Sequence, residues 1–100
     1  MRIIAKRTLR LFWQRHPTAE GALRTWHQVV QSADWLGPEQ VKRQFGSASF
    51  VADNRIVFNI GGNKYRLVVE MQYQAAIAWV KFIGTHAQYD QINVENVNDY

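Results

Sequence analysis

The sequence contains no cysteine and only two prolines among its 100 residues. Without thiols, the chain can form neither a disulfide framework nor a thiolate zinc site. Its longest apolar runs are far too short to span a bilayer, and no apolar stretch follows its basic beginning, as one would in a secretory signal. These absences lead us to expect a cytoplasmic protein that makes no membrane contact.

Acidic side chains are also scarce. Eight Asp and Glu face twelve Lys and Arg, which gives a formal net charge of +4. Residues 2–15 contain five basic side chains and no acid, whereas residues 86–100 contain three acids and no Lys or Arg. A basic chain is attracted to nucleic acid by counterion release, although a solvated helix face and an acidic tail would give the same distribution. The charge therefore permits RNA binding without establishing it.

The length fits one compact domain, residues 1–100, and the 47% hydrophobic content is enough for a core. In its first half, apolar residues mostly recur at helical spacing. We expect a strand at Arg2–Ala5, a helix at Lys6–Arg15, a second helix capped by Thr18 and running to about Ala33, and a short helical turn at Pro38–Phe45. Residues 46–54 are small and polar, which predicts an irregular connection.

The second half changes to strand-forming patterns. Three strands are predicted at Arg55–Ile60, Lys64–Met71 and Ala76–Ile83, and Gly61-Gly62-Asn63 forms a turn that tolerates positive φ between the first two. A loop at residues 84–90 follows the third strand. The predicted fold is therefore α+β, with an N-terminal strand and helices packed on a mainly antiparallel sheet.

Alternation along the two hairpin strands predicts which side chains share a face. One face is entirely apolar and should lie under the helices; it carries Ile56, Phe58, Ile60, Tyr65, Leu67, Val69 and Met71. The opposite face then keeps Asn59, Lys64 and Arg66 together on an open surface. This arrangement depends on the hairpin register, which a sequence does not determine.

Two segments are distinctive: residues 58–68, which span the Gly61-Gly62-Asn63 turn, and Thr85-His86-Ala87-Gln88-Tyr89-Asp90. From about Arg2 to Ile92, the sequence resembles the HigB family of toxin–antitoxin toxins, which is similar in fold to RelE. The resemblance implies a ribosome-dependent mRNA endoribonuclease that halts translation without a metal or other cofactor. It also implies inhibition by a HigA-like antitoxin with a helix-turn-helix.

The same resemblance implies that the active site lies on the open sheet and the C-terminal loop. RelE-like toxins have an arginine at the place of Arg66, and a histidine at the place of His86 is typical of the HigB branch. The lysines that RelE carries on the strand before the hairpin are absent, since Val57 and Asn59 occupy that stretch.

Residue chemistry fits attack of a 2′-hydroxyl on the neighbouring phosphate. His86 can exchange protons near neutral pH, and Arg66 offers a planar set of donors for phosphate oxygens. Tyr89 can stack on a base or assist proton transfer. We therefore predict Arg66, His86 and Tyr89 as catalytic residues.

Three further residues are predicted to contact RNA. Lys64 adds a point charge near the turn, and Asn59 can orient a phosphate or a base. Arg55, at the start of the first hairpin strand, completes this group.

Several plainer interpretations stay open. Arg66 can form a surface ion pair with Glu70, which lies on the same face. His86 and Asp90 have the spacing of a metal pair, but no third ligand is evident, so we expect no metal site. The four tryptophans are expected mainly in the core. As a whole, the chain can instead be a non-catalytic basic module that binds RNA or a protein, with its basic N-terminal helix receiving an acidic partner segment.

Overall fold

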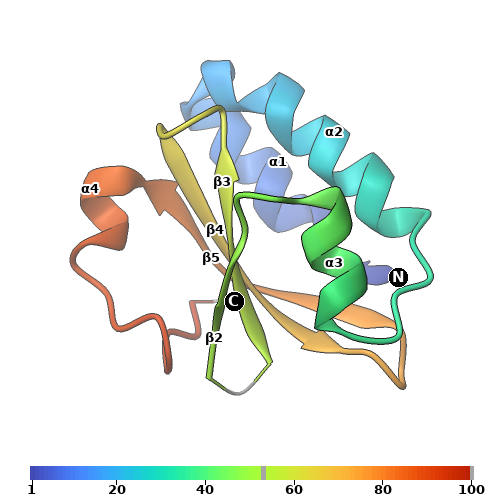
Figure 1. The fold of residues 1–100 in the computed structure, drawn as a ribbon. Coiled ribbons are helices and arrows are strands. Elements are labelled where there is room, and N and C mark those ends of the chain that lie inside the picture. The colour runs from blue at the N-terminus through green and yellow to red at the C-terminus, as the bar shows by residue number, and fades with distance from the viewer. Residues whose placement is uncertain (53, 100) are drawn as a thin grey trace.

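The computed structural model describes residues 1–52 and 54–99. Three helices pack on one face of a five-stranded sheet with strand order β1-β5-β4-β3-β2 (Figure 1). The elements are β1 (Arg2–Ile4), α1 (Lys6–Arg15), η1 (Pro17–Ala19), α2 (Glu20–Gln31), α3 (Pro38–Gln44), β2 (Ser49–Val51), β3 (Arg55–Ile60), β4 (Tyr65–Gln72), β5 (Ile77–Thr85) and α4 (His86–Tyr89). β1 is parallel to β5 and the other pairs are antiparallel, which confirms the predicted α+β class.

The first helix has the predicted bounds, and its apolar side, with Leu9, Phe12 and Trp13, is buried. The second helix begins differently from the prediction. Residues 17–19 form a 3₁₀ turn, and Ala19 precedes α2 without any side-chain cap. Thr18 is therefore not the N-cap; its hydroxyl instead forms a hydrogen bond with that of Tyr65, which ties this turn to the sheet.

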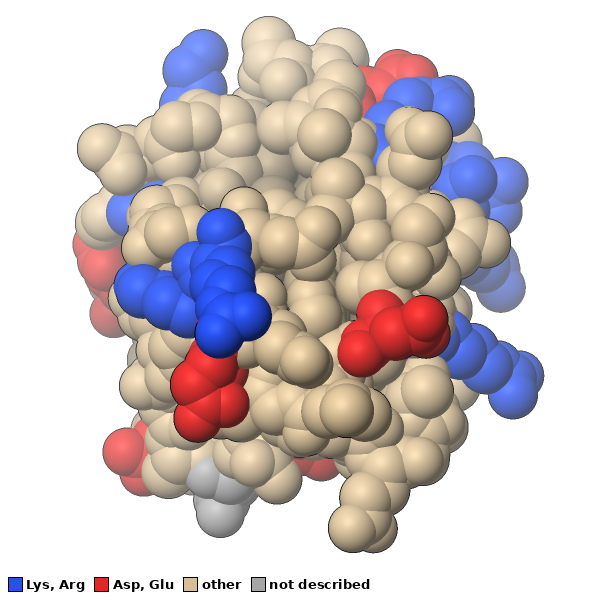
Figure 2. Space-filling model, turned by 45° about the vertical axis from the view of Figure 1, so that its right-hand side comes forward, with Lys and Arg blue, Asp and Glu red and all other residues tan. Residues whose placement is uncertain are grey.

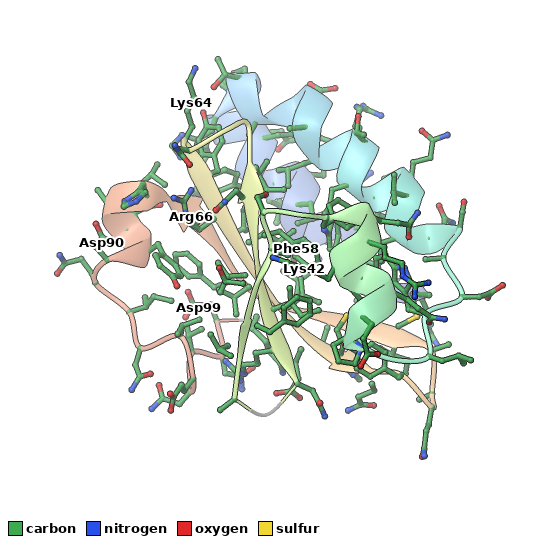
Figure 3. The ribbon with its side chains drawn as sticks, viewed as in Figure 1. Lys42, Phe58, Lys64, Arg66, Asp90 and Asp99 are labelled. Carbon is green, nitrogen blue, oxygen red and sulfur yellow. The ribbon has the colours of Figure 1, made fainter. Side chains whose placement is uncertain are left out.

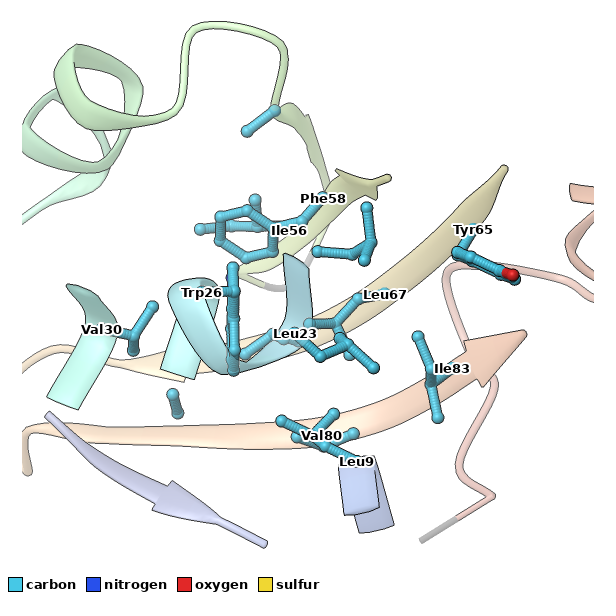
Figure 4. Close-up of a cluster of buried hydrophobic side chains, with 14 of the residues drawn as sticks. Leu9, Leu23, Trp26, Val30, Ile56, Phe58, Tyr65, Leu67, Val80 and Ile83 are labelled. Carbon is cyan, nitrogen blue, oxygen red and sulfur yellow. The ribbon is translucent and has the colours of Figure 1, made fainter. Parts of the chain in front are cut away.

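Between the helices and the sheet lies the main core (Figure 4). Trp26 from α2 and Phe58 from β3 meet edge to face, with ring centroids 5.4 Å apart. Trp13, Trp26 and Trp35 are buried here, as predicted, but Trp79 is only half-buried and does not belong to this cluster, so the prediction is wrong for Trp79. Aromatic rings contribute large apolar areas, so they dominate the packing of this small domain.

The connection predicted as irregular contains a strand. Residues 49–51 form β2, which pairs with the start of β3 and completes the sheet edge. The strand has only three residues and its Phe50 is exposed, so its sequence has little of the alternation that marks a longer strand.

The sheet face turned away from the helices is only partly open. A second apolar cluster, with Val57, Val68, Phe82 and Val97, covers its lower part. Val97 belongs to the segment after α4, which returns along the side of the sheet opposite the helices in Figure 1. The prediction of an open face thus holds for its upper part alone, because the C-terminal segment packs over the rest.

Candidate active site

The hairpin of β3 and β4 positions the predicted sheet residues. Its register places Asn59 opposite Arg66, and Arg66 in turn lies opposite Gly84 of β5. Gly61 and Gly62 adopt φ values of +62° and +71° in the turn, which residues with a Cβ rarely adopt. Asn59 and Arg66 are paired and so share a face, as predicted, whereas Lys64 lies exposed in the turn just before β4.

The segment after β5 is a short helix, where the sequence predicted a loop. The Thr85 hydroxyl accepts from the Gln88 N–H at 3.2 Å, and the Gln88 side chain accepts from the Thr85 N–H at 2.9 Å. This reciprocal capping box fixes the first turn of α4. The His86 N–H also donates to the carbonyl of Lys64 at 3.0 Å, which joins α4 to the end of the hairpin.

His86 and Arg66 are thereby brought to one surface. In Figure 3, Arg66 lies between β4 and α4, and Asp90 lies at the end of α4. His86 Nδ1 is 3.2 Å from Asp90 Oδ2, and about half of each side chain is exposed. A carboxylate on Nδ1 orients the imidazole and leaves Nε2 for substrate.

Arg66 is partly accessible. Its Nη1 donates to the carbonyl of Tyr65 at 3.2 Å. The alternative pairing with Glu70 does not occur, because Glu70 forms its ion pair with Arg55 instead. Arg66 therefore keeps donors for a ligand on this surface.

Tyr89 is half-buried against the sheet. Its ring lies 6.4 Å from that of Phe82, at an interplanar angle of 55°. Gly84 makes this approach possible, since a Cβ there would lie 2.5 Å from Phe82 Cζ and 2.8 Å from Gln88 Oε1. The absence of a side chain at Gly84 thus lets α4 lie close to the strand that carries Arg66.

Asn59 borders the site on the side of β2. Its amide donates to the carbonyl of Ser47 at 3.4 Å. The same loop is held by Lys42, whose Nζ donates to the carbonyls of Gly46 at 2.7 Å and Ala48 at 2.9 Å. Asn59 therefore lies between Arg66 and an anchored loop.

Arg55 is separated from these residues. It lies at the opposite end of β3 from Asn59 and is only 7% exposed. Its guanidinium contacts Glu70 and the carbonyls of Val94 and Val97. The expectation that Arg55 lies on an open surface is wrong, because the C-terminal segment covers it, and we leave it out of the candidate site.

Sequence reasoning missed the residues that shape α4. The capping box was visible as Thr85 followed three residues later by Gln88, and Gly84 as an isolated glycine in a strand. Asp90 was considered only as a metal ligand, whereas here it contacts His86. Across residues 1–52 and 54–99, no group of three or more His, Asp or Glu side chains has the arrangement of a metal site.

Charge is distributed unevenly over the surface. Figure 2 shows a face, turned from the view of Figure 1, that is largely uncharged, with basic side chains beside acidic ones at its left and further basic side chains along its right edge. Two side chains outside the site have shifted pKa values. Burial, and to a smaller extent the charge of Lys6, lowers the pKa of His27; burial, and to a smaller extent the charge of Glu39, raises the pKa of Tyr73.

In the described part of the chain, no helix is long and apolar enough to cross a membrane.

Comparison with known proteins shows the family of this sequence. Residues 19–92 match the model of the HigB toxin family, described as the RelE-like toxic component of a toxin–antitoxin system. A protein of Escherichia coli O6:H1 named mRNA interferase HigB is 28% identical over 92% of this chain and 91% of its own. The mRNA interferase toxin HigB of Escherichia coli K12 is 25% identical over 90% of this chain and 88% of its own. The chain therefore belongs to the HigB family of toxins, the RelE-like toxic components of toxin–antitoxin systems.

Proposed function

We propose that this chain is an endoribonuclease that cleaves mRNA on the ribosome and so halts translation. The observation that carries the proposal is that the backbone places Arg66 and His86 at neighbouring positions at one end of the sheet, through the pairing of Arg66 with Gly84 and the bond from the His86 N–H to the Lys64 carbonyl. Two relatives are named mRNA interferases, and the basic charge of the chain suits an RNA substrate. The cytoplasm, where mRNA is translated, is the proposed location.

The proposed reaction uses the 2′-hydroxyl of the RNA itself. Its oxygen attacks the adjacent phosphorus while its proton passes to a base, and the bond to the 5′-oxygen breaks as that oxygen gains a proton. The products are a 2′,3′-cyclic phosphate and a 5′-hydroxyl. His86, oriented by Asp90, exchanges one of these protons, and Arg66 stabilises the negative charge on the phosphorane. No metal or other cofactor takes part.

The neighbouring residues supply binding and orientation. Lys64, exposed at the turn, contacts a phosphate, and Asn59 orients a phosphate or a base. Tyr89 stacks on a base or takes part in proton transfer. Besides mRNA and the ribosome, the proposed partner is a HigA-like antitoxin with a helix-turn-helix, which inhibits the toxin.

The test is cleavage of mRNA on translating ribosomes, with mapping of the RNA ends. A single 2′-deoxy nucleotide at the mapped cut removes the attacking hydroxyl and should abolish cutting there while cutting elsewhere continues. The new ends should be a cyclic phosphate and a 5′-hydroxyl. Ends with a 3′-hydroxyl and a 5′-phosphate would contradict this chemistry.

A second measurement separates catalysis from binding. His86→Ala should fold and bind ribosomes as the parent does, yet leave the mRNA intact and relieve growth arrest. Salt-sensitive RNA binding by a parent protein that cuts nothing would instead indicate the non-catalytic RNA-binding or protein-binding module.

A further inference from the structure

Arg55 makes three contacts, one with the neighbouring strand and two that join the sheet to the C-terminal segment. Its Nη1 donates to the carbonyl of Val94 at 3.2 Å and to that of Val97 at 2.6 Å. Its Nε donates to Glu70 Oε1 at 3.3 Å, across the pairing of β3 with β4. Because a guanidinium presents its donors in a fixed planar arrangement, it holds these partners at a defined spacing.

Residues 92–99, here called the C-terminal strap, cross the lower part of the second sheet face (Figure 1). Val97 is 8% exposed and packs in one cluster with Val57, Val68 and Phe82. Ile92 and Val94 of the strap pack against the same cluster.

Backbone and side-chain bonds fix the far end of the strap. The Asp99 N–H donates to the carbonyl of Lys81 at 3.0 Å, and Lys81 Nζ donates to Asn98 Oδ1 at 3.1 Å. Lys81 lies at the irregularity between Val68 and Val69 in the pairing of β4 with β5, where the ladder is interrupted. The strap is thus attached to the sheet at both Arg55 and Lys81.

The strap also supports α4. A helix of four residues has almost no stability of its own, so its position depends on outside contacts. Tyr89 packs on Phe82 and belongs to the cluster that the strap completes. Displacing the strap would remove one side of the support beneath Tyr89, three residues after His86.

We propose that Arg55 is a positioning residue for the RNA-cleaving site. By holding the carbonyls of Val94 and Val97, it fixes the strap, and the strap fixes α4 with His86 and Tyr89. The inference rests on the proposed function where it concerns cleavage. Its structural half, that the order of α4 depends on Arg55, stands independently of any activity.

The substitution Arg55→Lys distinguishes this role from direct contact with RNA. A lysine keeps a positive charge and can bind a phosphate, but its single ammonium nitrogen cannot serve Glu70 and both carbonyls together, which Arg55 reaches through two separate nitrogens, Nε and Nη1. If Arg55 contacts RNA directly, Arg55→Lys should retain much of the parent's activity, with weaker binding as the main defect. If Arg55 is a positioning residue, Arg55→Lys should lose most of that activity.

The experiment compares Arg55→Lys, Val97→Asp and the control Glu70→Gln with the parent in ribosome-dependent cleavage. Val97→Asp disturbs the strap and leaves Arg55 intact, whereas Glu70→Gln keeps an acceptor for Arg55 Nε. Arg55→Lys and Val97→Asp should each lower kcat about tenfold to a hundredfold at nearly unchanged KM. This is the size of effect that a small misplacement of catalytic groups produces. Glu70→Gln should stay within about twofold of the parent, since its bond to Arg55 is kept.

Amide hydrogen exchange provides the readout that does not require activity. In Arg55→Lys and in Val97→Asp, the amides of residues 86–97 should exchange at least tenfold faster than in the parent. The amides of β4 should stay protected, which shows that the domain is folded. Parent-like exchange in that segment would overturn the positioning role, as would Arg55→Lys with parent-like kcat and a raised KM. If the parent itself cuts no mRNA, the proposed function fails, and the exchange data alone decide whether Arg55 orders α4.

Discussion

Arg55 and Arg66 lie on the same face of one hairpin, at opposite ends, and they differ in what covers them. Arg55 is buried beneath the C-terminal strap and binds Glu70 and two carbonyls. Arg66 is partly accessible and lies opposite Gly84, beside the helix that carries His86. One face of a small sheet thus supplies both a structural attachment and a candidate catalytic surface. The C-terminal strap covers the first and leaves the second accessible.

The largest expected effect is on activity at the accessible end of the hairpin. Arg66→Ala should lower cleavage of ribosome-bound mRNA about a thousandfold, since it removes charge stabilisation from the transition state. Its melting temperature should stay within about 2 °C of the parent, because exposed substitutions rarely cost much stability. Arg66→Lys is the matched variant and should retain part of the activity. Full activity of folded Arg66→Ala would remove this residue from the mechanism.

At the covered end, the effect should fall on stability instead. Arg55→Met removes a buried charge and leaves Glu70 and two carbonyls without their partner, at a cost of about 3 kcal/mol. In a domain of this size, that corresponds to a melting temperature lower by about 15 °C. Thermal unfolding monitored by circular dichroism measures it, with the exposed Arg43→Met as control. A loss below about 0.5 kcal/mol would show that the buried contacts contribute little.

This contrast marks what the sequence could and could not predict. Alternation along β3 and β4 correctly assigned Asn59 and Arg66 to one face, and the helical spacing gave α1 its bounds. The cover over Arg55 was missed because Val94 and Val97 reach it from about forty residues away, and no local pattern reports such a contact. Short elements were missed for a related reason: β2 and α4 are held by pairing and capping rather than by periodicity.

Gly84 tests how closely the accessible end must pack. Gly84→Ala places a Cβ within 3 Å of Phe82 and Gln88, so the ring and the capping side chain must both move. We expect a loss of about 2 kcal/mol in the free energy of unfolding and displacement of α4 from Arg66. Chemical denaturation and cleavage assays should both report the change. Gly46→Ala is the control, since no atom lies within 4 Å of its added Cβ.

Tyr89 separates packing from chemistry within the site. Tyr89→Phe keeps the ring against Phe82 and removes the hydroxyl, whereas Tyr89→Ala removes both. If the ring acts by stacking, the phenylalanine variant should cleave as the parent does and the alanine variant about tenfold more slowly, as for the loss of one stacked base. Equal losses in the two variants would assign the role to the hydroxyl. Single-turnover cleavage at saturating toxin makes this distinction.

His27 gives the smallest effect and separates acid sensitivity of the fold from that of the site. Burial, with a smaller contribution from Lys6, lowers its folded-state pKa below 6.5, so the unfolded chain takes up the proton first. Stability from this group is therefore complete above about pH 6.5 and declines as the pH falls below it. His27→Gln should flatten the dependence of unfolding free energy on pH in that range and leave the pH profile of cleavage unchanged. An altered cleavage profile in His27→Gln would instead show that a residue on the helical side of the molecule contributes to the pH dependence of activity.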